Sequence, residues 1–177
     1  MERVLKMENM TIGFIGTGNM GGALAKAVFK SGKAGQILLA NRSLSKAEKL
    51  ADLTGGRICS NKDVAANADY IFLGIEPGGL EELACEISPV LSGRNTRFIL
   101  VSILAGKAVS ALEESLGHYP VIRIMPNMPA SEGCGFSLYT ANSLVTKDEK
   151  EYFYHLMKTP LPCGAVAPMD VVLCCDL

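Results

Sequence analysis

Short, strongly apolar runs alternate along the chain with longer segments in which apolar residues recur every three or four positions. The runs that read as strands are residues 12–15, 36–40, 69–75, 97–102 and 121–125, with shorter candidates at 57–60 and 136–140. Continuous apolar strands separated by helices are typical of a parallel sheet that is covered on both faces. The pattern therefore predicts an α/β fold, a doubly wound Rossmann-type parallel sheet with helices on both faces.

The helical segments between these runs carry recognisable ends. Gly32 is placed to end a first helix at about Ser31, and Gly55 to end a second helix that Ser43 caps. Thr146 and Glu149 have the spacing of a capping box for a helix through residue 158. Further helices are expected at 61–67, 80–91 and 107–116. Residues 159–177 contain three prolines and little periodicity, so an irregular segment is expected there.

A glycine-rich turn follows the first predicted strand. Gly16, Gly18 and Gly21 have the G-x-G-x-x-G spacing, and Asn19 and Met20 open the helix behind them. In a dinucleotide site the first glycine permits the tight turn, the second lets a pyrophosphate approach the backbone, and the third lets the helix pack close to the strand. The N–H groups of the helix start then face the phosphates. A turn with a purely steric role is the alternative interpretation.

The choice of cofactor depends on the end of the second predicted strand. Asn41, Arg42 and Ser43 stand there, with Lys46 one helical turn further on. NAD-binding sites usually place an acid at this position to bind the ribose hydroxyls. Here a guanidinium, a hydroxyl and an amide are available for a 2′-phosphate instead, which favours NADP(H) over NAD. The alternative is a solvated helix start with a surface arginine.

Composition narrows the possible partners. The net charge of the 177 residues is −1 without a basic block, so electrostatic binding to nucleic acid is not expected. No apolar run reaches the length of about 18 residues that a membrane span needs, and the charged first ten residues suggest a cytoplasmic protein. The six cysteines form no C-x-x-C pair and only two histidines accompany them. Small buried thiols are therefore expected, and no metal site.

Taken together, these motifs resemble the pyrroline-5-carboxylate reductases. The resemblance runs from about residue 12 to residue 135 and includes the most specific piece, M-P-N-x-P at Met125 to Pro129. The other matching pieces are F-I-G-x-G-N-M at 14–20, N-R-S with Lys46 at 41–46, A-D-Y at 68–70 leading into 73–77, and V-S-I with A-G at 101–106. The resemblance implies NADPH-dependent reduction of 1-pyrroline-5-carboxylate, a cyclic imino acid, to L-proline.

The same resemblance implies a role for each matching residue. Gly18, Asn19 and Met20 would contact the pyrophosphate, and Asn41, Arg42 and Ser43 the adenosine phosphate. The remaining contacts would lie along the nicotinamide and its ribose, at Ile75, Pro77, Ala105 and Asn127. A rigid turn leaving the sheet is the alternative for residues 125–129.

The chain departs from the family pattern in two places. Glu76 stands where the family usually has lysine, and the helical domain that holds the substrate and forms the family's dimer has no counterpart after residue 158. We therefore expect an NADP-binding Rossmann domain over 1–158, an irregular truncated tail over 159–177, and little turnover by this chain alone. No catalytic residue is assigned, because the family's lie in that second domain.

Two other functions stay open at this level. One is a non-catalytic NADP-binding module that pairs with a partner through an uncovered apolar face. The other is the NADP-binding domain of a β-hydroxyacid dehydrogenase or of a deazaflavin-dependent oxidoreductase. Proteins of those two families share the glycine turn, but their patterns do not explain M-P-N-x-P.

Overall fold

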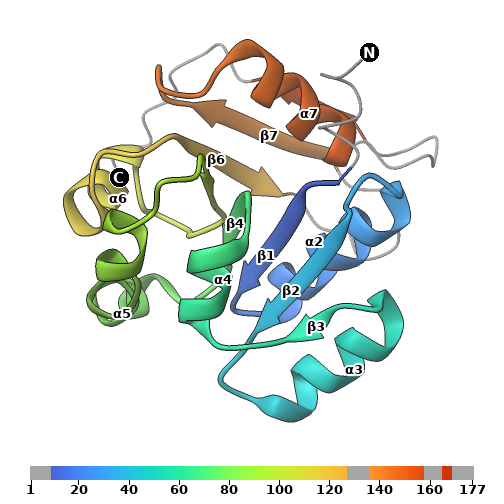
Figure 1. Cartoon of the computed structure of the whole chain (residues 1–177). Helices are drawn as coiled ribbons and strands as arrows, with labels where there is room; N and C mark the ends of the chain where they lie inside the picture. The colour runs from blue at the N-terminus through green and yellow to red at the C-terminus, as the bar shows by residue number, and fades with distance from the viewer. Residues whose placement is uncertain (1–8, 127–135, 158–164, 169–177) are drawn as a thin grey trace.

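The structure is a computed structural model that describes residues 9–126, 136–157 and 165–168. One sheet of eight strands runs through it in the order β3-β2-β1-β4-β5-β6-β7-β8 (Figure 1). The strands are β1 (Thr11–Ile15), β2 (Gln36–Ala40), β3 (Arg57–Ile58), β4 (Tyr70–Leu73), β5 (Ile99–Ser102), β6 (Val121–Pro126), β7 (Phe136–Ala141) and β8 (Ala165–Pro168). The first six are parallel to one another, which confirms the predicted doubly wound fold.

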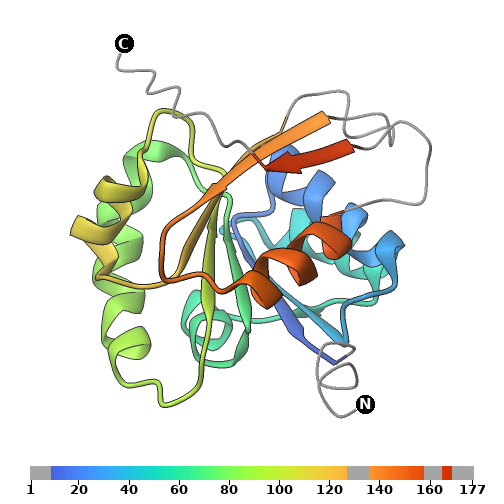
Figure 2. The ribbon, with the colours of Figure 1, turned by 90° about the horizontal axis from the view of Figure 1, so that it is seen from above.

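Helices cover both faces of the sheet (Figure 2). They are α2 (Asn19–Ser31), α3 (Leu44–Thr54), α4 (Asn61–Asn67), α5 (Leu80–Ser92), α6 (Val109–Leu116) and α7 (Lys147–Met157), with a short 3-10 turn η1 (Pro77–Gly79) before α5. Buried side chains of α2, α3 and α7 pack on one face, and those of α4, α5 and α6 on the other. Successive side chains along a strand pack into the cores on opposite faces of the sheet, as Phe14 and Ile15 do in β1.

Helix α7 is fastened to the sheet by both packing and polar contacts. Phe153 is fully buried, and its ring lies 6.3 Å from that of Phe72, which in turn stacks on Phe14 at 4.6 Å. The Arg97 guanidinium donates to both carboxylate oxygens of Glu149, at 2.8 and 3.0 Å. Glu149 also completes the predicted capping box with Thr146. Burial alone would raise the pKa of Glu149, but these hydrogen bonds outweigh it and hold that pKa below its usual value.

Several local predictions need correction. The short strand expected over residues 57–60 is limited to Arg57–Ile58, and the helix expected from residue 107 begins at Val109. Within the segment expected to be irregular, residues 165–168 form β8, which pairs in parallel with β7. β7 itself runs antiparallel to β6. The edge strand β8 has no recognisable local signal, because its four residues show too few alternations of apolar and polar side chains.

Two predictions about single side chains also need correction. Ser43 precedes α3, but its hydroxyl lies 3.3 Å from the Ser45 hydroxyl and makes no capping hydrogen bond. Cys85 is exposed and Cys59 only half-buried, although buried thiols were expected. Cys85 follows the apolar pair Leu83 and Ala84 of α5 and so falls on the outer side of the helix. The other four cysteines lie outside the described residues. None of the helices in the described part of the chain is long and apolar enough to cross a membrane.

Candidate cofactor-binding site

Many of the predicted site residues lie at the carboxyl ends of the parallel strands. Ile15, the last residue of β1, lies opposite Ala40 of β2 and Leu73 of β4, so these three strands end in one row. The chain leaves β1 through α2 on one face and leaves β4 through α5 on the other. In open α/β sheets this reversal of direction creates the crevice in which ligands bind.

Two of the three glycines are required by the packing of the chain itself. Gly16 has a φ of +88°, and a Cβ there would lie 2.6 Å from the carbonyl carbon of Gly74. A Cβ on Gly21 would collide with the carbonyl oxygen of Gly16. The turn is also held by Gly16 N–H, which donates to Ala40 O at 2.9 Å, and by Gly74 N–H, which donates to Ile15 O at 2.8 Å. These two glycines therefore let the turn and α2 lie close to β4.

Gly18 has no such packing role. Its φ is −65°, which any residue adopts, and a Cβ built there would meet nothing within 4 Å. It stands at the N-cap of α2, whose first turn contains no acidic residue. The open space therefore lies against the positive end of a helix dipole, where a phosphate is stabilised. This cradle fits the pyrophosphate of a dinucleotide.

Thr17 adds an unpaired polar atom to this turn. The residue is 5 % exposed, and its Oγ1 is buried without a hydrogen-bond partner in the described part of the chain. Buried hydroxyls nearly always have a partner, because leaving one unsatisfied costs about 1–3 kcal/mol. The backbone N–H of Thr17 is satisfied, since it donates to the Asn41 side chain at 3.1 Å.

The four polar residues predicted to bind a 2′-phosphate all lie between the end of β2 and the first turn of α3. Asn41 is half-buried and joins two loops, accepting from Thr17 N–H and donating to Ser43 O at 2.9 Å. Arg42 and Lys46 are exposed and Ser43 is half-buried. Asn41 thus positions the glycine turn, while Arg42 and Lys46 are the charged groups that solvent and ligands can reach.

A cavity of about 710 Å³ opens beside these residues. It is lined by Ile15, Gly16, Gly18, Ala40, Asn41, Arg42, Cys59, Ser60, Asn61, Gly74, Ile75, Glu76, Gly79, Glu82, Leu83 and Glu86. Of the residues predicted to contact the nicotinamide side, Ile75 lines it. Pro77 opens η1 and Ala105 lies in the exposed turn after β5, both outside this lining. Asn127 lies outside the described residues.

The α5 wall of this cavity was not predicted from the sequence. Gly79, Glu82, Leu83 and Glu86 face it, at the spacing of one side of a helix. Glu86 accepts a hydrogen bond of 2.8 Å from the Asn61 amide, and Glu82 lies 3.6 Å from the Arg42 guanidinium. The helical spacing of these residues was visible in the sequence, but their proximity to the end of β2 was not. Glu76, the residue at which the resemblance led us to expect a lysine, is exposed to water.

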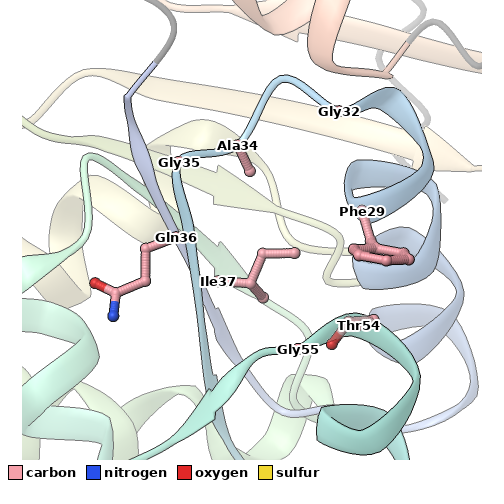
Figure 3. A pocket seen from close by; sticks show the side chains of 8 residues that line it. All are labelled: Phe29, Gly32, Ala34, Gly35, Gln36, Ile37, Thr54 and Gly55. Atoms are coloured by element: carbon pink, nitrogen blue, oxygen red, sulfur yellow. The ribbon is translucent and has the colours of Figure 1, made fainter.

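A second, smaller cavity lies beside the amino-terminal end of β2, the end opposite to the one that lines the larger cavity (Figure 3). Its volume is about 290 Å³, and its lining comes from the ends of α2 and α3 and the start of β2, with Phe29, Ile37 and Thr54 among the side chains. None of the predicted site residues lines it. Within the described residues, no cluster of three or more His, Cys, Asp or Glu side chains is arranged to hold a metal ion. The larger cavity is therefore the candidate cofactor site.

A family model described as NADP oxidoreductase coenzyme F420-dependent matches residues 11–106. This range covers the glycine turn, the loop after β2 and the α5 wall of the cavity.

Individual proteins are similar over a longer range. A pyrroline-5-carboxylate reductase of Escherichia coli is 39% identical over 142 residues, which are 78% of this chain and 52% of the relative. The solved structure of a pyrroline-5-carboxylate reductase from Coxiella burnetii superposes with a TM-score of 0.83 at 28% identity, covering 93% of this chain and 60% of that one. A Plasmodium falciparum pyrroline carboxylate reductase, solved with NADP bound, gives 0.76 at 27% identity, covering 92% and 58%. The chain thus spans about half the length of the curated relative and three fifths of the solved ones.

Proposed function

Because the chain belongs to the family described as NADP oxidoreductase coenzyme F420-dependent, we propose that it is the NADPH-binding part of a pyrroline-5-carboxylate reductase. Such an enzyme reduces a cyclic imino acid, 1-pyrroline-5-carboxylate, to L-proline. The proposal is supported by the similarity to the named relatives and by the family-like motif pieces in the sequence of this chain. A cytoplasmic location, expected from the composition, belongs to the same proposal.

The observation that carries the proposal is the geometry around Gly18. The space beside its Cα is open, it faces the N-terminus of α2, and it leads directly into the 710 Å³ cavity. Gly16 and Gly21 explain the shape of the turn without any ligand, but the open space at Gly18 has no use in the packing of the chain. A pyrophosphate is the group that fits it, since its oxygens accept hydrogen bonds from free backbone N–H groups.

In this proposal the residues of the chain bind and orient the cofactor. The turn at residues 16–21 would hold the pyrophosphate, and Arg42 with Ser43 and Lys46 the 2′-phosphate. Asn41 would fix the glycine turn relative to the loop after β2 through its hydrogen bonds to Thr17 and Ser43. Ile75 would give an apolar wall at the end of β4. When bound, NADPH would supply the hydride for the imine carbon, and the protein's contribution is orientation and electrostatics.

A titration of the 177-residue chain with NADPH and NADH, followed by fluorescence of the reduced nicotinamide, tests the proposal. We expect NADPH to bind at least about tenfold more tightly, the effect of one charge-assisted hydrogen bond. Addition of 1-pyrroline-5-carboxylate should then give little oxidation and little proline, because this chain spans about half of its relatives' length. Equal affinity for the two cofactors would contradict the assignment of Arg42, Ser43 and Lys46. Absence of any binding would overturn the proposed function itself.

The description of the family supports a second candidate. It refers to coenzyme F420, a deazaflavin, so the cavity of this chain would serve an oxidoreductase that transfers hydride between NADP and that coenzyme. The same preparation, offered NADPH and a deazaflavin, distinguishes the two. Reduction of the deazaflavin would favour the second candidate. NADPH binding without reaction toward either acceptor would instead fit the non-catalytic module.

A further inference from the structure

The cofactor cavity has an unusual balance of charge for a site that would bind a phosphate. Of the residues that line it, Arg42 is positively charged, while Glu76, Glu82 and Glu86 are negatively charged. The Glu86 carboxylate accepts a hydrogen bond of 2.8 Å from the Asn61 amide. Glu82 lies 3.6 Å from the Arg42 guanidinium. The cation at the end of β2 therefore already has a carboxylate beside it.

The two partners come from different elements that line the cavity. Arg42 follows β2, whereas Glu82 lies in the first turn of α5, forty positions later in the chain. Their side chains are 92 % and 80 % exposed, so neither is held by packing and both are free to turn toward another partner. Exposed ion pairs are weak, and a dianionic phosphate within reach of Arg42 competes well against a single carboxylate.

We propose that Glu82 competes with the 2′-phosphate of the cofactor for Arg42 and so limits the preference for NADPH over NADH. This inference rests on the proposed cofactor role of Arg42. A ligand with a 2′-phosphate has to separate Arg42 from Glu82 before its phosphate can bind the guanidinium. A ligand without the phosphate leaves the pair intact. Glu82 therefore lowers the affinity for NADPH and leaves the affinity for NADH unchanged.

The variant Glu82→Gln tests this, because it keeps the shape of the side chain and removes its charge. The probes are adenosine 2′,5′-bisphosphate and adenosine 5′-monophosphate, which differ only in the 2′-phosphate, titrated calorimetrically into the full chain at low salt. We expect Glu82→Gln to raise the affinity for the bisphosphate about twofold to fivefold, the range of an exposed ion pair. The affinity for the monophosphate should not change.

Glu81→Gln is the matched control. Glu81 lies in the same first turn of α5, so its loss has the same effect on the helix dipole, but its carboxylate accepts from the Ser115 hydroxyl at 3.0 Å. This variant should leave both affinities unchanged. In an Arg42→Ala background, Glu82→Gln should have no effect, because the competition needs the guanidinium.

Three results would overturn the inference. These are no gain in Glu82→Gln, an equal gain for both nucleotides, and a gain that persists without Arg42, which would mean a general effect of charge. Failure of the proposed function looks different, because the unaltered chain would then bind neither nucleotide.

Discussion

Replacing Gly18 by alanine tests whether this glycine is required for cofactor binding and not for the stability of the fold. The added Cβ meets nothing within 4 Å, and the φ of −65° suits alanine. Reduced freedom of the unfolded chain stabilises such a variant by about 0.4–1 kcal/mol. Alanine is a poorer N-cap than glycine, by about 0.5–1.5 kcal/mol. The two effects nearly cancel, so the free energy of unfolding should stay within about 1 kcal/mol of the original.

Cofactor binding should respond very differently. If the pyrophosphate approaches the backbone at Gly18, a Cβ there removes at least one charge-assisted hydrogen bond, worth about 1.5–3 kcal/mol. The affinity for NADPH should fall about tenfold to 150-fold. Fluorescence titration measures this affinity, and urea denaturation measures stability on the same preparation.

Gly21→Ala provides the contrast. Its Cβ would overlap the carbonyl oxygen of Gly16, and backbone cannot move aside as a flexible side chain does. Overpacking costs about 1–3 kcal/mol, and the better helix propensity of alanine offsets about 1 kcal/mol of it. Because the overlap is with backbone, the upper part of the overpacking range applies, and we expect a net loss of about 1–2 kcal/mol, or several degrees in Tm. The reasoning is refuted if Gly18→Ala binds NADPH normally, or if it is destabilised as much as Gly21→Ala.

Three further predictions concern the polar contacts around the sheet. Arg42→Ala should weaken the binding of NADPH about tenfold or more and leave the binding of NADH unchanged. Asn41→Ala, which loses the hydrogen bonds to Thr17 and Ser43, should weaken the binding of both cofactors alike. If the two variants had equal effects in the titration, the different roles given to Arg42 and Asn41 would be wrong. Arg97→Ala should destabilise the protein by about 1 kcal/mol at neutral pH, a modest value because Arg97 is half exposed. Since the folded-state pKa of Glu149 is depressed, the stabilisation by the Arg97–Glu149 pair is present above the usual pKa of 4.5 and is lost as the pH falls toward the lowered folded-state pKa. If urea denaturation of the variant showed the same pH dependence as that of the original protein, this pH effect would be ruled out. Tyr152→Phe, which removes the 3.0 Å hydrogen bond to Lys33 O, should cost about 0.5–1.5 kcal/mol, and an unchanged denaturation midpoint would show that water replaces the bond without loss.

Local patterns were enough to predict the type of fold and the glycine turn after the first strand. Apolar runs such as 36–40 and helix ends such as Gly32 and Gly55 depend on interactions within a few residues, and the structure places strands and left-handed C-caps there. The G-x-G-x-x-G spacing is equally local. Parallel strands bring their carboxyl ends to one edge, so the gathering of Gly18, Asn41 and Ile75 also follows from the sequence once the fold is known.

Contacts between distant parts of the chain needed the tertiary structure. The order of the glycines in the motif suggests separate roles for Gly16, Gly18 and Gly21, but only the structure shows that backbone atoms lie behind Gly16 and Gly21 and none behind Gly18. The sequence also presents Asn41 and Arg42 as equal phosphate ligands, although one holds the glycine turn and the other meets Glu82. These distinctions arise only when β1 pairs with β2 on one side and β4 on the other, and no local periodicity encodes that order of strands.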